Sequence, residues 1–239
     1  DDVYSEWEEF FNSEEKVNYK FDTNSQDGFF PFRSESAKDN PIKDLKEFFH
    51  VYPNTNLPDF LSKNTNHLYG ELVNLGNTLL SWLDELTPHN IKNEFSETLF
   101  EMSKGSDRNL LRVLHYPPVK GEVEQGAIRA AAHEDINLIT LLVSGSQPGL
   151  EAMDMNGVWH KVPVDKGMIT VNVGDMLQMA SNKYFPSTSH RVVNPENSKQ
   201  NVSRFSLPMF MHPRNEVILR SGITAFDYLQ ERLKEINLK

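Results

Sequence analysis

Residues 128–143 read IRAAAHEDINLITLLV, and this stretch decides the expected fold. Runs rich in Ile, Leu, Val and Thr between polar residues are typical of β-strands, so one strand is predicted over 128–135 and another over 138–143. Because side chains alternate along a strand with period two, His133 and Asp135 are expected to point to the same face. Two possible metal ligands can therefore reach one ion.

The same pattern extends over the chain from about residue 108 onward, where short β-rich runs alternate with turn residues. Further strands are predicted over 110–116, 150–155, 159–162, 169–173, 191–193 and 202–210. Eight strands in succession favour a double-sheet jelly roll. The fold class is therefore predicted to be mainly β with flanking helices, with a jelly-roll catalytic core over 108–214.

Helices are expected on both sides of this core. The part over 1–107 is predicted to be mainly helical, and its apolar residues over 66–86 recur every three or four positions, which describes a long amphipathic helix that can brace a sheet. Shorter helices are predicted over 4–11 and 40–49. A last helix over 226–236, in the segment 215–239, is interpreted as an external buttress. One domain over 1–239 is expected, because this length suffices for a single core.

Composition limits what the protein can do. Its net charge of -10 argues against nucleic acid and anionic membranes as partners. The chain has no cysteine, so a metal site must use His and carboxylate ligands, and this composition fits a reducing cytoplasm. The start, Asp1-Asp2-Val3-Tyr4, has neither an initiator Met nor a signal peptide. We therefore expect a truncated N-terminus and a cytoplasmic protein without a membrane span.

A second histidine strengthens the case for a metal. His190 opens another predicted strand, and two imidazoles with one carboxylate form the facial triad that suits non-haem Fe(II). Three coordination positions then stay open for an organic acid and O2. Taken alone, the His133-Glu134-Asp135 triplet is weak evidence, and for His190 in isolation a strand-end histidine bonded to backbone is the favoured interpretation.

A possible carboxylate clamp lies on the last predicted strand of the core. Arg204 and Ser206 are two residues apart, so they are expected on one face, while Phe205 and its apolar neighbours occupy the other. A planar guanidinium can bond both oxygens of a carboxylate, and the hydroxyl adds a third donor. The alternative is a surface arginine on an edge strand.

The order His-x-Asp, His and Arg-x-Ser resembles the isopenicillin N synthase-like family of Fe(II)- and 2-oxoglutarate-dependent oxygenases. Further stretches follow in family order: LRVLHYPP over 111–118, GLE over 149–151, GVW over 157–159, VNVGDMLQ over 171–178, SN over 181–182 and HRVV over 190–193. The resemblance is close over about 108–214 and looser in the N-terminal part. It implies a double-stranded β-helix fold.

The same resemblance implies a 2-oxoglutarate-dependent dioxygenase, an oxidoreductase whose cofactors are Fe(II), 2-oxoglutarate and O2. It implies that His133, Asp135 and His190 bind the metal, that Arg204 and Ser206 hold the distal carboxylate of 2-oxoglutarate, and that Tyr116 donates to this carboxylate as well. Many plant members have Asn where this chain has Leu114, which implies a drier or reshaped pocket.

The expected reaction is hydroxylation of an organic small molecule with release of succinate and CO2. Two alternatives stay open: an iron oxidase of the same fold that does not use 2-oxoglutarate, and a non-catalytic ligand-binding domain. Oxygen uptake without added oxoacid would identify the first of these alternatives.

Two regions are expected to face the substrate. Arg129 lies four residues before His133 and is predicted on the same strand face, where it can bind an anionic group of the substrate. An internal ion pair with an acid such as Glu124 is the alternative. The loop over 26–36 is unusually aromatic and resembles the family loop that lines a substrate site. The residues predicted there are Phe29, Phe30 and Arg33.

Overall fold

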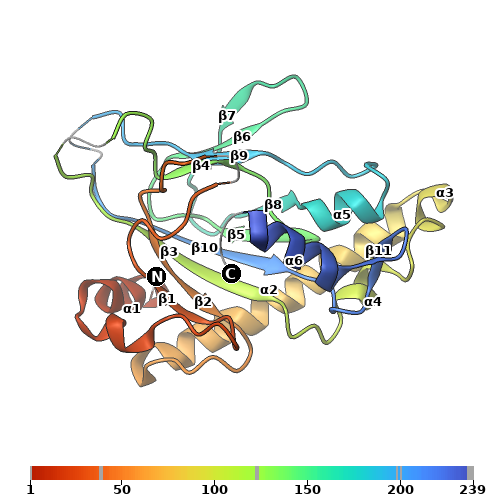
Figure 1. The fold of residues 1–239 in the computed structure, drawn as a ribbon, viewed down its shortest axis with the longest axis horizontal. Helices are drawn as coiled ribbons and strands as arrows, with labels where there is room; N and C mark the ends of the chain where they lie inside the picture. The colour runs from red at the N-terminus through yellow and green to blue at the C-terminus, as the bar shows by residue number, and fades with distance from the viewer. Residues whose placement is uncertain (1, 38–39, 122–123, 198, 200, 236–239) are drawn as a thin grey trace.

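The computed structural model describes residues 2–37, 40–121, 124–197, 199 and 201–235. Its centre is a pair of antiparallel sheets that pack against each other (Figure 1). The six-stranded sheet has the order β1 (Gly28–Phe30), β2 (Glu47–Val51), β3 (Leu110–Tyr116), β10 (Arg204–Met211), β5 (Ile139–Val143) and β8 (Ile169–Val173). The four-stranded sheet has the order β4 (Ala130–His133), β9 (His190–Val192), β6 (Leu150–Met153) and β7 (Trp159–Lys161). The predicted double-sheet core is confirmed.

Each of the eight predicted strands is present, although some of their bounds differ. β3 and β8 begin and end where the sequence predicts. β4, by contrast, ends at His133 rather than at residue 135, so Asp135 lies in the loop that follows the strand. The period-two argument for the direction of Asp135 was therefore wrong, and another explanation is needed for its position.

The N-terminal part contains less helix than expected, because residues 40–49 do not form one. Their second half enters β2, which is buried along its whole length and pairs with β1 on one side and β3 on the other. Phe48 and Phe49 are covered on opposite faces of this strand. Burial on both faces and two hydrogen-bonded ladders outweigh the helix start signal at Pro41. β1 likewise lies inside the predicted loop over 26–36.

The remaining helices match the prediction more closely. α2 begins at Asp59, directly after Pro58, and so is longer than the predicted helix over 66–86. The described helices are α1 (Asp2–Asn12), η1 (Glu15–Tyr19), α2 (Asp59–Leu86), α3 (His89–Lys92), α4 (Leu99–Ser103), α5 (Asp175–Ala180) and α6 (Ala225–Glu235). A short ribbon of β11 (Ile218–Arg220) and β12 (Ile223–Thr224) precedes α6. None of these described helices has the length and apolar character needed to cross a membrane.

The two faces of the six-stranded sheet pack against different parts of the protein. α2 runs along the outer face (Figure 1), and its leucines share one core with Phe205, Leu207 and Met209 of β10. α2 therefore braces the sheet, as expected. The inner face carries a smaller core, in which Tyr116 and other residues of the large sheet meet Ala130 and Val192 of the small one. The site lies on this inner side.

Trp7 on α1 anchors the N-terminal part to the outer core. Its indole is fully buried and donates a hydrogen bond of 3.1 Å from Nε1 to Thr65 Oγ1. The ring centroids of Phe10 and Phe49 each lie 5.3 Å from that of Trp7. This cluster covers the outer face of the sheet where β1 and β2 lie.

We expect Trp7→Ala to lower the free energy of unfolding by about 3–5 kcal/mol, because truncation of a buried aromatic side chain leaves a cavity. Trp82→Ala is a matched control, since Trp82 lies on α2 with 54% of its surface exposed, and such a change should alter stability by about 0.5 kcal/mol or less. Urea unfolding followed by circular dichroism measures both. Similar losses in the two variants would contradict the anchoring role of Trp7.

Candidate functional site

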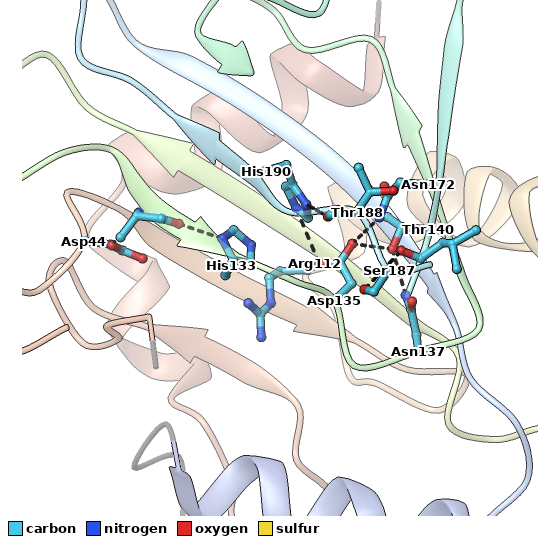
Figure 2. A network of polar contacts seen from close by, with 12 residues as sticks. Asp44, Arg112, His133, Asp135, Asn137, Thr140, Asn172, Ser187, Thr188 and His190 are labelled. Atoms are coloured by element: carbon cyan, nitrogen blue, oxygen red, sulfur yellow. Dashed lines mark hydrogen bonds and ion pairs between the residues drawn. The ribbon is translucent and has the colours of Figure 1, made fainter. Parts of the chain in front are cut away.

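The structure brings His133, Asp135 and His190 together between the two sheets (Figure 2). Each side chain offers one ligand atom, and these atoms all lie within 4.8 Å of one another. The pairing of β4 with β9 accounts for the two histidines, because His133 lies opposite His190 in the register. Their ring centroids are 4.4 Å apart. Such a group has the size and composition needed to hold one divalent ion.

Hydrogen bonds fix the orientation of both imidazoles. His133 Nδ1 lies 2.7 Å from the carbonyl oxygen of Ala131, and His190 Nδ1 lies 3.0 Å from that of Thr188. A carbonyl can only accept, so Nδ1 carries the proton in each ring. In the neutral imidazole, Nε2 then keeps its lone pair, as a metal ligand requires.

Asp135 is positioned by its loop and by two neighbouring side chains. Thr140 Oγ1 donates to Asp135 Oδ2 at 2.6 Å, and Asn172 Nδ2 donates to the same oxygen at 2.9 Å. The other oxygen, Oδ1, lies 3.6 Å from His190 Nε2. The backbone amide of Asp175 donates to the carbonyl of Asp135 at 2.8 Å and holds the loop itself. Oδ1 is thus the carboxylate oxygen turned toward the histidines.

The electrostatics of the group suit a metal. Burial, assisted by nearby His190, lowers the pKa of His133 to about 4, so this imidazole is neutral near pH 7. Burial raises the pKa of Asp135, but the two histidines and the hydrogen bonds from Asn172 and Thr140 lower it more strongly, and the resulting pKa is below its ordinary value. A neutral imidazole and an ionised carboxylate are the forms that bind divalent cations.

Arg204 and Ser206 lie on the inner face of β10, on the opposite side from the core face of that strand. Arg204 is paired with Tyr116 in the ladder, and its guanidinium carbon lies 5.1 Å from the centre of the Tyr116 ring. Arg204 Nε donates to the carbonyl of Gln147 at 3.0 Å, whereas the buried Nη1 has no hydrogen-bond partner among the described residues. Ser206 is paired with Leu114, the position that departs from many plant sequences.

A cavity of about 830 Å³ opens beside the three candidate ligands. His133 and Asp135 line it, and its other walls come from the large sheet, the loop over 21–26 and α6. Phe226, Leu229 and Leu233 of α6 face this space. The helix therefore forms a wall of the cavity, a role that the expectation of an external buttress did not include. Its mixed charge concealed the apolar side that faces inward.

A buried charge cluster in this cavity was not predicted. Lys46 Nζ lies 2.6 Å from Glu35 and 2.9 Å from Asp44, and Arg112 Nη1 lies 3.4 Å from Glu35. Arg112 Nε donates to His50 Nε2 at 2.9 Å, so His50 is neutral there. Burial lowers the pKa of His50 well below its ordinary value, and Arg112 lowers it further.

Arg112 is held rigidly within this cluster. Its guanidinium carbon lies 4.7 Å from the centre of the Phe48 ring and 5.6 Å from that of Phe210. With Nε bonded to His50 and Nη1 beside Glu35, Nη2 has no hydrogen-bond partner in the part of the chain that the structure describes. In the view of Figure 2, Arg112 lies between His133 and Asp135, and all three residues line the large cavity.

The residues predicted to face the substrate are dispersed. Phe30 lines the large cavity, whereas Phe29 packs in the outer core. Arg33 forms an ion pair of 2.9 Å with Glu124, so the alternative that paired Glu124 with Arg129 was wrong. Arg129 is buried and lines a second cavity of about 280 Å³. Its predicted contact with substrate stays a prediction.

Comparisons with known proteins agree with this chemistry. The family model described as 2OG-Fe(II) oxygenase superfamily matches residues 108–213. A proline hydroxylase, buaE, from Petromyces alliaceus is 30% identical over 230 residues, which cover 82% of this chain and 70% of that protein. Several other curated 2-oxoglutarate-dependent oxygenases match over shorter stretches, and the chain spans 33% to 46% of their length.

Solved structures extend the match to almost the whole chain. A protein from Shewanella oneidensis assigned as an oxygenase shares 49% identity at a TM-score of 0.86, over 98% of this chain and 83% of that one. A full-length protein from Neurospora crassa, solved in complex with alpha-KG and thymine, shares 25% identity at a TM-score of 0.77, over 97% of this chain and 82% of that one.

We expect Thr140→Val to weaken divalent metal binding by about 10- to 100-fold, because Asp135 loses the hydroxyl that orients its carboxylate. Thr140→Ser retains the hydroxyl and is the matched control. Calorimetric titration with Mn(II) measures the affinity without oxygen chemistry. Equal affinities of the two variants would show that this hydrogen bond does not orient a metal ligand.

Proposed function

Because the chain belongs to the 2OG-Fe(II) oxygenase superfamily, we propose that His133, Asp135 and His190 hold its ferrous ion and that Arg204 and Ser206 hold its 2-oxoglutarate. The protein is an Fe(II)- and 2-oxoglutarate-dependent oxygenase. The observation that carries the assignment of residues is the convergence of two imidazoles and one carboxylate within 4.8 Å.

The donor set fits ferrous iron. Two imidazoles and one carboxylate would hold an iron ion and leave coordination positions for an oxoacid and O2, the ligand set used by non-haem iron oxygenases. The proposed ligand atoms are Nε2 of both histidines and Oδ1 of Asp135, because Nδ1 and Oδ2 are engaged in the hydrogen bonds described above. Among the described residues, no second group of His and carboxylate side chains converges in this way.

The residues around Arg204 fit a carboxylate. A guanidinium that is 1% exposed, with one Nη lacking a partner among the described residues, carries an uncompensated charge that an anion can neutralise. Ser206 and Tyr116 are buried beside it and add hydroxyl donors. Leu114, in register with Ser206, supplies an apolar wall. The proposed pocket therefore bonds the end of a short dicarboxylic acid and keeps that end out of water.

When bound, ferrous iron and 2-oxoglutarate react with O2 so that one oxygen atom enters succinate, the other enters the substrate, and CO2 leaves. The protein's own part is to bind and orient. The two Nδ1–H groups keep the imidazoles in the metal-binding tautomer, and Thr140 and Asn172 restrain the carboxylate of Asp135. Aromatic walls such as Phe30 and Phe210 exclude water from the reacting atoms.

The substrate that we propose is a small organic molecule with a planar acceptor group, such as a carboxylate, bound by Arg112. Three observations support this: a cavity of a size suited to a small molecule, the rigid clamping of Arg112, and its Nη2 without a partner among the described residues. Relatives are consistent, since the Petromyces protein is named for proline and the Neurospora structure holds thymine.

Arg204→Lys tests the co-substrate assignment. The ammonium of lysine cannot make the two parallel hydrogen bonds of a planar guanidinium, so 2-oxoglutarate should bind about 10- to 100-fold more weakly. This is a loss of about 1.5–3 kcal/mol of binding free energy. Mn(II) affinity should be unchanged. Anaerobic titration of the Fe(II) protein, followed by the absorption band of the iron–oxoacid complex, measures the affinity for the oxoacid.

Arg214→Lys is a matched control, because Arg214 forms surface ion pairs with Glu97 and Glu216. Equal oxoacid affinity in wild type and Arg204→Lys would reject the assignment.

Arg112→Gln tests the substrate class. A panel of small carboxylic acids is screened for compounds that stimulate succinate formation by the wild-type protein. For an acid that does so, the variant should need about 10-fold or more of it for half-maximal stimulation, because a charge-assisted hydrogen bond is lost. Affinity for 2-oxoglutarate should stay at the wild-type value. An unchanged half-maximal concentration would exclude Arg112 from substrate binding.

A further inference from the structure

Arg129 is a buried guanidinium without a counter-charge among the described residues. It is 2% exposed and precedes β4, four residues before the first candidate ligand. Its Nη2 donates to the carbonyl of Val202 at 2.6 Å, but its buried Nε has no hydrogen-bond partner in the described part of the chain. No described acidic side chain forms an ion pair with it. An arginine in this state leaves both a charge and a donor uncompensated.

A second guanidinium lies close by. Arg204 follows Val202 by two residues, and Val202 is the residue whose carbonyl Arg129 bonds. Burial lowers the pKa of Arg129 to about 10, and the nearby charge of Arg204 contributes in the same direction. Burial also lowers the pKa of Arg204. Arg129 and Arg204 are thus two buried positive charges in one region of the protein. Each has a buried nitrogen without a hydrogen-bond partner among the described residues.

We infer that Arg129 is a second binding residue of the 2-oxoglutarate pocket, where it and Arg204 bind the distal carboxylate together. The inference rests on the proposed function. A carboxylate between the two guanidiniums can accept hydrogen bonds from the unpartnered N–H groups of both arginines, and its negative charge offsets their mutual repulsion. Tyr116 supports the assignment, because its ring lies beside the guanidinium of Arg204, where its hydroxyl can donate to the same carboxylate.

The placement of Arg129 explains why it does not line the large cavity. That cavity reaches His133 and Asp135, whereas Arg129 lies with Gln147 at the wall of the second cavity. Gln147 is also the residue whose carbonyl accepts from Arg204 Nε at 3.0 Å. Arg129 therefore bonds Val202, two residues before Arg204, and shares a cavity wall with Gln147, which Arg204 bonds. These contacts hold Arg129 in the neighbourhood of Arg204 and outside the lining of the large cavity.

The test compares two acids that differ only at their distal end. 2-Oxoglutarate carries the distal carboxylate, and 2-oxovalerate has the same chain length without it. Both are titrated by calorimetry into the Mn(II)-loaded protein without oxygen. In Arg129→Met, 2-oxoglutarate should bind about 10- to 100-fold more weakly, as expected for the loss of a charge-assisted hydrogen bond. Binding of 2-oxovalerate should change by about twofold or less.

Two further variants complete the design. Arg129→Lys keeps the charge but not the planar guanidinium, so its selectivity for 2-oxoglutarate over 2-oxovalerate should fall less than that of Arg129→Met. If Arg129→Met does not fold, Arg129→Lys decides the question. Lys161→Met is the control, because Lys161 also lines the second cavity but is exposed and paired with Glu196. Equal weakening of both acids, or of neither, overturns the role of Arg129. A wild-type protein that does not bind 2-oxoglutarate refutes the proposed function itself.

Discussion

The hydrogen-bonded register between β4 and β9 is the constraint on which the rest of the site depends. It sets His133 opposite His190, although the two residues belong to widely separated parts of the chain. The residues before His133 are alanines, and Ala130 and Ala131 are buried. Because these side chains are small, the four-stranded sheet can approach the six-stranded sheet closely enough to share an interior with Tyr116 and Arg204. A slip of one residue would turn the histidines to opposite faces.

Asp135 reaches the histidines by a different route. It follows β4 in a loop that α5 holds from behind: the amides of Asp175 and Met176 donate to the carbonyls of Asp135 and Asn137 at 2.8 and 3.0 Å. Gly174, at the start of α5, makes this possible. A Cβ there would lie 2.5 Å from the carbonyl oxygen of Asn137, closer than real contacts allow. The carboxylate is therefore placed by close backbone packing and by its two hydrogen-bonded neighbours.

Features that depend on one strand could be predicted from the sequence, and features that depend on several segments could not. The alternation around Arg204 correctly separates the inner face of β10 from its core face, because period two is a local property. The pairing of Lys46 and Arg112 with Glu35 arises only when β2 and β3 lie side by side. In the sequence these charges look solvated. The helix predicted over 40–49 failed for the same reason, since the neighbours that bury both faces of β2 are distant in the chain.

Part of the wall of the large cavity comes from outside the segment that carries the candidate ligands. The ligands and the proposed oxoacid pocket lie between residues 108 and 213, whereas much of the cavity wall comes from the first 52 residues and from α6. The wall segments outside 108–213 can therefore change without altering a candidate ligand, whereas Arg112 and Phe210 belong to the segment that carries the ligands. Exchange of the outer segments between related chains would be expected to reshape the substrate cavity, and chimeric proteins are a practical route to new selectivity on an unchanged metal site.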